Sequence, residues 1–151
     1  MIDQQNFKVV SVTPPAAIID DAAVVTAVID TRGFDYCNIF VYSGATDIAM
    51  VSLSVQESDA SGSGFANVPG LIWGTSTNID GDVSGVPTAL DDNLHQVAQV
   101  DLLGRKRYLD VSCVMGDGSA GGFIAIHALL SRAGESPVTV AQMGCNEVLR
   151  V

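Results

Sequence analysis

The chain has 151 residues, of which 48% are hydrophobic and only 16% are charged, and its formal net charge is −10. This length fits one domain with a sizeable core, and the scarcity of Lys and Arg argues against direct nucleic-acid binding, which depends on neutralising phosphates. No apolar run reaches the ~18 residues that a membrane helix needs, and no signal-peptide pattern opens the sequence. The mean hydropathy of +0.34 is high for a soluble protein. It favours apolar surface that is hidden in an assembly as well as in a core.

Strand-like runs alternate with turn residues through the first half of the chain. Residues 1–15 are interpreted as an N-terminal arm, in which Phe7–Val12 is a short edge strand stopped by Pro14 and Pro15. Glu57–Gly64 is too polar to contribute to a core and is expected to be a surface loop. Further strands are expected at Ala23–Ile29, Tyr36–Tyr42, Ile48–Gln56 and Phe65–Val68.

The second half begins with a segment that is difficult to assign, Leu71–Asp92. It holds the only tryptophan, Trp73, among Gly, Thr, Asn and Asp residues, and is expected to run over the surface. Leu94–Leu102 alternates again and predicts a strand. Towards the C-terminus, Val138–Met143 is expected to form one helical turn and Asn146–Val151 an extended arm.

The most regular pattern lies in Leu102–Ser131, which predicts a β-hairpin. Its first arm, Arg107–Met115, has the period-two alternation of a half-buried strand. Gly116–Ser119 tolerates the positive φ angles of a tight reversal. The second arm, Gly122–Leu130, is apolar on both faces apart from His127, which is typical of a central strand or of one covered by another subunit.

These elements together predict an all-β fold. Seven or eight short strands separated by Gly, Asp and Ser turns, without any helical period, indicate an antiparallel sandwich, jelly roll or barrel. Residues 16–151 are expected to form a single sandwich domain after the N-terminal arm.

No set of catalytic residues emerges from the sequence. His95 and His127 stand in separate predicted strands, and pairing Cys113 with His127 has no local support, since no G-x-S-x-G motif is present. A structural role for His127, as a hydrogen-bonded core or interface residue, is preferred to a catalytic one. The chain is therefore not expected to be an enzyme.

Metal and redox sites are also not expected. The three cysteines have no C-x-x-C spacing, and Cys37 and Cys113 are interpreted as small buried apolar side chains. Asn78–Asp82 has the oxygen-rich composition of a calcium loop, but Pro87 stands where an EF-hand needs its Glu. An ordinary Asx-type turn is the preferred interpretation, and no cofactor is expected.

The basic residues are concentrated in one place. Arg105, Lys106 and Arg107 are three of only seven basic residues. They are either a solvated strand entry or a cationic contact to an acidic neighbour or partner. For an intersubunit or capsid contact, the candidates are Arg105, Lys106, Arg107, His127 and Arg150.

Four motifs in this order resemble the head decoration, or cement, proteins of tailed bacteriophages: Asp30–Tyr36, Gln56–Asp59, Leu103–Leu109 and Leu130–Ala133. The resemblance implies a β-sandwich of jelly-roll type that forms homotrimers on the outer surface of the virion. Such a protein is made in the host cytoplasm, contacts the major capsid protein and holds neighbouring capsomers together. The family has no catalytic residues to carry over. Independently of the resemblance, the arms at both ends, Met1–Pro15 and Asn146–Val151, are expected to lie along neighbours and to become ordered on binding.

Two alternatives to a decoration protein remain open. One is another structural part of a phage, in the tail, the base of a head fibre or the connector. The other is a carbohydrate-binding β-sandwich, in which exposed Trp73, Tyr36 and Tyr42 would be the platforms for sugar rings.

Overall fold

The computed structural model describes residues 6–135 and 139–149, and this part of the chain is almost entirely β-structure. A short 3₁₀ helix, η2 (Ala89–Asp91), interrupts the strands, and no helix among the described residues is long and apolar enough to cross a membrane. The strands are β1 (Phe7–Thr13), β2 (Ile29–Asp30), β3 (Phe34–Thr46), β4 (Ser52–Ser58), β5 (Ala66–Ile72), β6 (His95–Asp101), β7 (Tyr108–Val114) and β8 (Gly122–Ala133).

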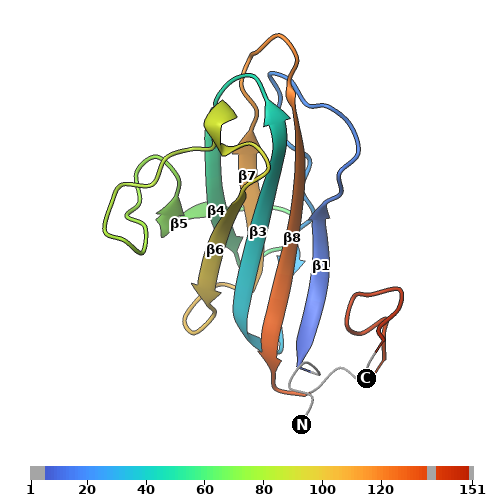
Figure 1. The fold of residues 1–151 in the computed structure, drawn as a ribbon. Helices are drawn as coiled ribbons and strands as arrows, with labels where there is room; N and C mark the ends of the chain where they lie inside the picture. Colours follow the sequence, from blue (N-terminus) through green and yellow to red (C-terminus); the bar gives the residue numbers. More distant parts are fainter. Residues whose placement is uncertain (1–5, 136–138, 150–151) are drawn as a thin grey trace.

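The eight strands form two four-stranded antiparallel sheets packed face to face (Figure 1). The front sheet has the order β1-β8-β3-β6, and the back sheet has the order β2-β7-β4-β5. Pairing of the first strand with the eighth, the second with the seventh, the third with the sixth and the fourth with the fifth is the jelly-roll arrangement. The predicted fold class is therefore confirmed.

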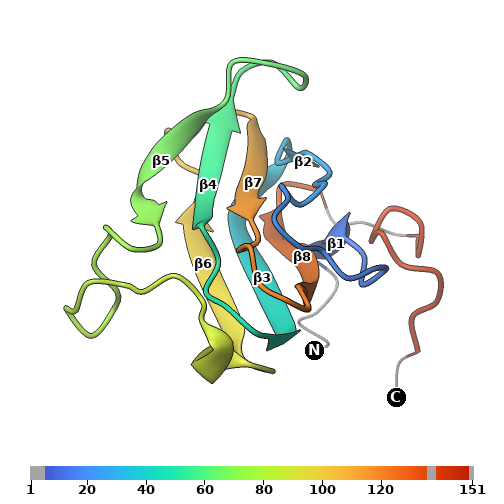
Figure 2. The same ribbon diagram turned by 90° about the horizontal axis from the view of Figure 1, so that it is seen from above.

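The core lies between the two sheets, whose layers are separated when the molecule is viewed from above (Figure 2). Alternate residues of each strand point into it: Ile39 of β3, Val111 of β7 and Ile126 of β8 are at most 1% exposed. Burial of each such side chain contributes roughly 1.5–3 kcal/mol. The period-two patterns of β3 and β7 are confirmed by this burial, and β8 is a central strand of its sheet, one of the two alternatives that its apolar sequence predicted.

The predicted hairpin between Leu102 and Ser131 is wrong, because β7 lies in the back sheet and β8 in the front sheet. The glycines that join them serve close packing. A Cβ at Gly116 would collide with the Ala49 carbonyl, and one at Gly118 with the carboxylate of Asp47. That carboxylate accepts hydrogen bonds from the backbone N–H groups of Ser119 and Ala120. The connection is thus a crossing between sheets.

The predicted strand Ala23–Ile29 is also largely wrong, since only Ile29 enters a strand, β2, and Ala23 makes an isolated bridge. The backbone of this segment hydrogen-bonds first to one sheet and then to the other. Val24 donates its N–H to Cys113 of the back sheet, whereas Ala27 donates to Val12 of the front sheet. A segment that closes the side of the sandwich in this way cannot follow one strand ladder.

The bounds of two further strands, β4 and β5, differ from those that the sequence predicted. The strand expected at Ile48–Gln56 starts only at Ser52, because Met50 is buried while Val51 is 65% exposed, which reverses the expected alternation. The short strand expected to stop before Pro69 continues as β5 to Ile72. β5 is an edge strand, where a proline does not interrupt an internal ladder.

The N- and C-terminal segments meet at the free edge of the front sheet. Phe7–Val12 forms the expected edge strand within β1, so the described part of the N-terminal arm belongs to the sandwich. Beyond β8, Met143 donates its N–H to Thr139, as in one helical turn, and accepts the N–H of Val9. Val138, where that turn was expected to begin, and the last two residues of the C-terminal arm lie outside the described residues.

Candidate functional site

The outer surface of the front sheet carries aromatic and aliphatic side chains among polar ones, and few of its side chains are charged. We call the outward-pointing residues of its four strands the front face. They alternate with the buried residues of the same strands and are brought side by side by the strand register. The front face comprises Phe7, Val9, Ser11, Tyr36, Asn38, Phe40, Tyr42, His95, Val97, Gln99, Asp101, Phe123, Ala125, His127, Leu129 and Ser131.

A cluster of rings lies at the centre of the front face. Phe40 of β3 stands opposite His127 of β8, and their rings stack with centroids 5.0 Å apart and an interplanar angle of 12°. On the other side, His95 of β6 meets Phe40 edge-on at 6.5 Å and Tyr42 at 4.6 Å. The chain has only two histidines, and the fold places both against the same phenylalanine.

Burial and the proximity of His95 lower the pKa of His127. At neutral pH this imidazole is therefore uncharged, and it adds to the apolar character of the surface around Phe40. Charged groups lie only at the far end of the face. Asp101 pairs in register with Tyr36, and the Arg132 guanidinium lies 5.3 Å from the centre of the Tyr36 ring.

The outer surface of the back sheet, which we call the back face, is polar. Its outward residues on β7 and β4 include Asp110, Ser112, Ser54 and Gln56. The Asp110 carboxylate accepts a hydrogen bond from the hydroxyl of Thr26. The Asn67 side-chain oxygen accepts from Ser54 at 3.0 Å and from Gln56 at 3.0 Å. This is the composition and hydrogen bonding of a sheet surface that faces water.

The three basic residues singled out in the sequence lie together, but each has a carboxylate partner within its own chain. Arg105 contacts Glu57 at 3.5 Å and Lys106 contacts Asp59 at 3.6 Å.

Arg107 forms a two-point pair with Asp30, with Nη2–Oδ2 at 2.7 Å and Nε–Oδ1 at 2.9 Å, and this hydrogen bonding lowers the pKa of Asp30. The pairs join the entry of β7 to its neighbours. The expected contact with another chain stays a prediction for these residues. The remaining two candidates are separated: His127 lies in the front face, and Arg150 lies outside the described residues.

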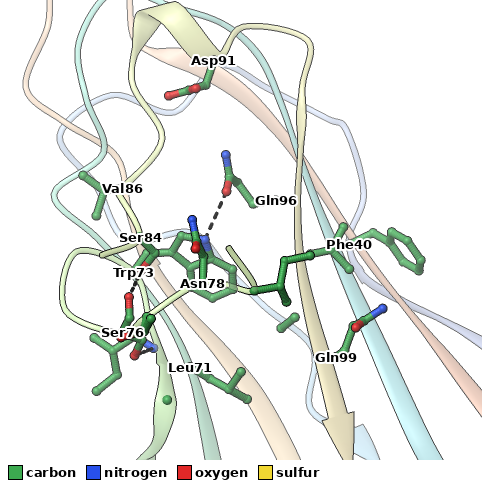
Figure 3. Close-up of a pocket in the computed structure, with 17 residues that line it drawn as sticks. Phe40, Leu71, Trp73, Ser76, Asn78, Ser84, Val86, Asp91, Gln96 and Gln99 are labelled. Carbon is green, nitrogen blue, oxygen red and sulfur yellow. Dashed lines mark hydrogen bonds between the residues drawn. The ribbon is translucent and has the colours of Figure 1, made fainter. Parts of the chain in front are cut away.

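Trp73 lies in a depression of about 780 Å³ beside β6, and Phe40 of the ring cluster also lines this depression (Figure 3). Its indole Nε1–H donates to Gln96 at 3.1 Å, and its half-buried ring packs against the core. Tyr36 and Tyr42 point outward from β3 instead. The three aromatic side chains therefore do not form one exposed platform of the kind expected for sugar binding.

The Asn78–Asp82 loop is the Asx-type turn expected from the sequence. The Asn78 side-chain oxygen accepts from the backbone N–H groups of Asp80 and Asp82, each at 3.0 Å, and Gly81 takes the positive φ of 94°. This oxygen is thus occupied within the turn. Among the described residues, no three His, Cys, Asp or Glu side chains are grouped as a metal site requires.

The cysteines behave as apolar core residues. Cys37 and Cys113 are buried, and burial raises the pKa of each thiol to about 12. Neither sulfur is therefore available as a thiolate at neutral pH. The interpretation of these two residues as small buried side chains is confirmed.

Sequence reasoning missed the ring cluster as a site, although it identified the strands that build it. The signal was the alternation of Tyr36, Asn38, Phe40 and Tyr42, which places four large side chains on one face of a strand.

The chain matches no known family model, and no curated protein matches it.

Proposed function

We propose that this chain is a structural virion protein, a capsid decoration protein that binds as a homotrimer to the outside of a tailed-phage head. It is made in the host cytoplasm, contacts the major capsid protein and stabilises the lattice of capsomers. It acts by binding alone, without catalysis or a cofactor. The sequence motifs that resemble decoration proteins and the jelly-roll fold support this proposal.

The observation that carries the proposal is the front face. Val97 and Phe123 are 43% and 46% exposed there, and half-buried Phe40 pairs in register with Val97, so apolar side chains of this face meet solvent in the single chain. Such surfaces on soluble proteins mark contacts with other chains. Interface centres are likewise enriched in aromatic side chains and depleted of charge.

The distribution of charge supports a further copy of this chain as the partner on this face. The protein carries a formal charge of −10, so most of its surface repels a second copy of itself. Among the outward positions of the front sheet, only Asp101 carries a carboxylate. The front face is therefore where two copies approach with little repulsion, and we assign it to the trimer contact.

The physical action of such a protein is mass action. A protein that binds only the assembled capsid stabilises it by RT ln(1 + [L]/Kd), which is about 2.7 kcal/mol per site when the free concentration is about 100 times Kd. A trimer contributes several such contacts at once. The pressure of packaged DNA then has to break these contacts as well as those of the shell.

The copy number in purified virions, relative to the major capsid protein, tests the proposal. We expect a ratio near one, measured by quantitative mass spectrometry of virions from the phage that encodes this chain. A few copies per particle would instead assign the protein to the tail, the connector or a fibre base. Cryo-electron microscopy of the same virions distinguishes these positions directly.

A further inference from the structure

The two histidines of the front face make the contact between copies sensitive to acid. We propose that protonation of His95 and His127 releases the subunits from one another, so that the assembly is stable at neutral pH and dissociates in mild acid. The inference rests on the proposed trimer contact and adds its regulation.

The geometry places both imidazoles at the centre of the contact. His127 stacks on Phe40, and His95 meets the same ring from the opposite side and touches Tyr42. A second copy that covers Phe40 therefore removes both imidazoles from water as well. Removing a charged imidazole from water is costly unless an anion accompanies it.

No anion accompanies them on the surrounding strands. Phe40 and Asn38 face His127 from β3, Ser11 faces it from β1, and none of these is charged. The carboxylate on this face, Asp101, pairs in register with Tyr36 at its far end, where Arg132 also lies.

The carboxylates closest to His95 along the chain are already engaged. The Asp91 carboxylate accepts from the N–H and hydroxyl of Thr88, and the Asp92 carboxylate accepts from the N–H of Thr46. Neither imidazole takes part in an ion pair within the described part of the chain, so each would be buried without a carboxylate in contact with it. The lowered pKa of His127 in the single subunit shows the same tendency before any second copy covers it.

The sign of the effect follows from linkage. Covering His127 lowers its pKa further, so association is strongest while this imidazole is neutral, and it weakens as the pH falls below the pKa of His127 in the free subunit. Protonation of His127 then weakens association by up to about tenfold per pH unit below that value. Protonation also reduces the net negative charge, and general repulsion between copies would weaken. Burial of protonated imidazoles would make association weaker in acid, whereas reduced repulsion would make it stronger. The sign of the pH response therefore distinguishes the two effects.

The test is sedimentation equilibrium of the full chain at about pH 7.5 and about pH 5. The carboxylates keep most of their charge at both values. For the unmodified protein, the concentration of half-dissociation is expected to rise at least about tenfold at the lower pH. The doubly substituted His95→Gln, His127→Gln protein is expected to associate equally at both values. Circular dichroism confirms that each variant is folded.

Two single substitutions make the test specific. Asn38→His adds an imidazole to the front face and is expected to steepen the acid response, whereas Ser112→His adds one to the back face and is expected to leave it unchanged. A trimer with the same affinity at both pH values overturns this inference and leaves the decoration proposal intact. Acid dissociation that persists in the double variant also overturns it. A monomer at about pH 7.5 overturns the trimer contact itself.

Discussion

The two outer faces of the sandwich are built on the same alternation but carry different chemistry. On the back face, Ser54, Gln56 and Asn67 bond to one another, as expected for a surface in water. On the front face, Phe40 gathers two histidines and a tyrosine, and few charges surround them. Both faces cover the same core, so folding does not require the difference. We infer that a second copy of the chain covers the front face.

The largest expected effect comes from placing one negative charge on each face in turn. Phe40→Asp introduces a carboxylate at the centre of the front face, where burial without a partner costs several kcal/mol. We expect association to weaken by more than about 100-fold, a change of about 2.8 kcal/mol at about 1.4 kcal/mol per factor of ten. Ser112→Asp on the back face is the matched control, and light scattering compares the two. Equal masses for both variants would remove the distinction between the faces.

Substitutions of two adjacent leucines of β8 are expected to separate an effect on folding stability from an effect on association. Leu130 is fully buried, so Leu130→Ala is expected to lower the free energy of unfolding of the subunit by about 2–5 kcal/mol. Leu129 points outward, so Leu129→Ala is expected to cost less than about 1 kcal/mol in folding and to weaken association instead. Urea unfolding at low protein concentration and light scattering at high concentration measure the two quantities. Loss of folding stability in both variants would contradict the assignment of Leu129 to a surface.

The ion pair between Arg107 and Asp30 lies outside both faces and is expected to have a small effect. Because the pair is exposed and screened by solvent, Arg107→Ala should lower the free energy of unfolding far less than Leu130→Ala does. The folded pKa of Asp30 is lowered, so its contribution is present at neutral pH and is lost as the pH falls through that folded pKa. Urea titrations of Asp30→Asn and the unmodified protein should therefore converge in acid. A loss of trimer in Arg107→Ala would instead assign this cluster to the subunit contact, as the sequence first indicated.

The smallest effect is expected from thiol reagents, which test the common core beneath both faces. Cys37 and Cys113 have pKa values of about 12, and both are buried, so neither should react in the native protein. Cys145 is partly exposed and is expected to be modified first. Mass spectrometry after brief labelling counts the modified thiols. Rapid labelling of Cys113 in native buffer would show that the two sheets separate readily.

The sequence was sufficient for the fold class because strand alternation is a local property. Ile39 and Val111 lie in alternating runs, and both are buried. The partner of each strand is not local, and for this reason the pattern of β7 and β8 was mistaken for a hairpin. In a jelly roll these consecutive strands lie in different sheets, and the glycines between them allow the close crossing.

The candidate site was less accessible from the sequence than the fold. Phe40, His95 and His127 lie in three strands, and only the register of β3 with β6 and β8 brings their rings together. Each histidine seen alone was an ordinary strand residue. The Arg105–Arg107 cluster was conspicuous because it is continuous in sequence, but its charges are paired with Glu57, Asp59 and Asp30 of the same chain.

The mass of the unmodified protein in neutral solution tests the central claim most directly, namely that copies of this chain cover one another's front faces. Multi-angle light scattering behind size-exclusion chromatography is expected to give three times the chain mass of 15.7 kDa. The same measurement on Phe40→Asp should give the single-chain value. A mass of one chain for the unmodified protein, across the concentrations found in an infected cell, would contradict the account.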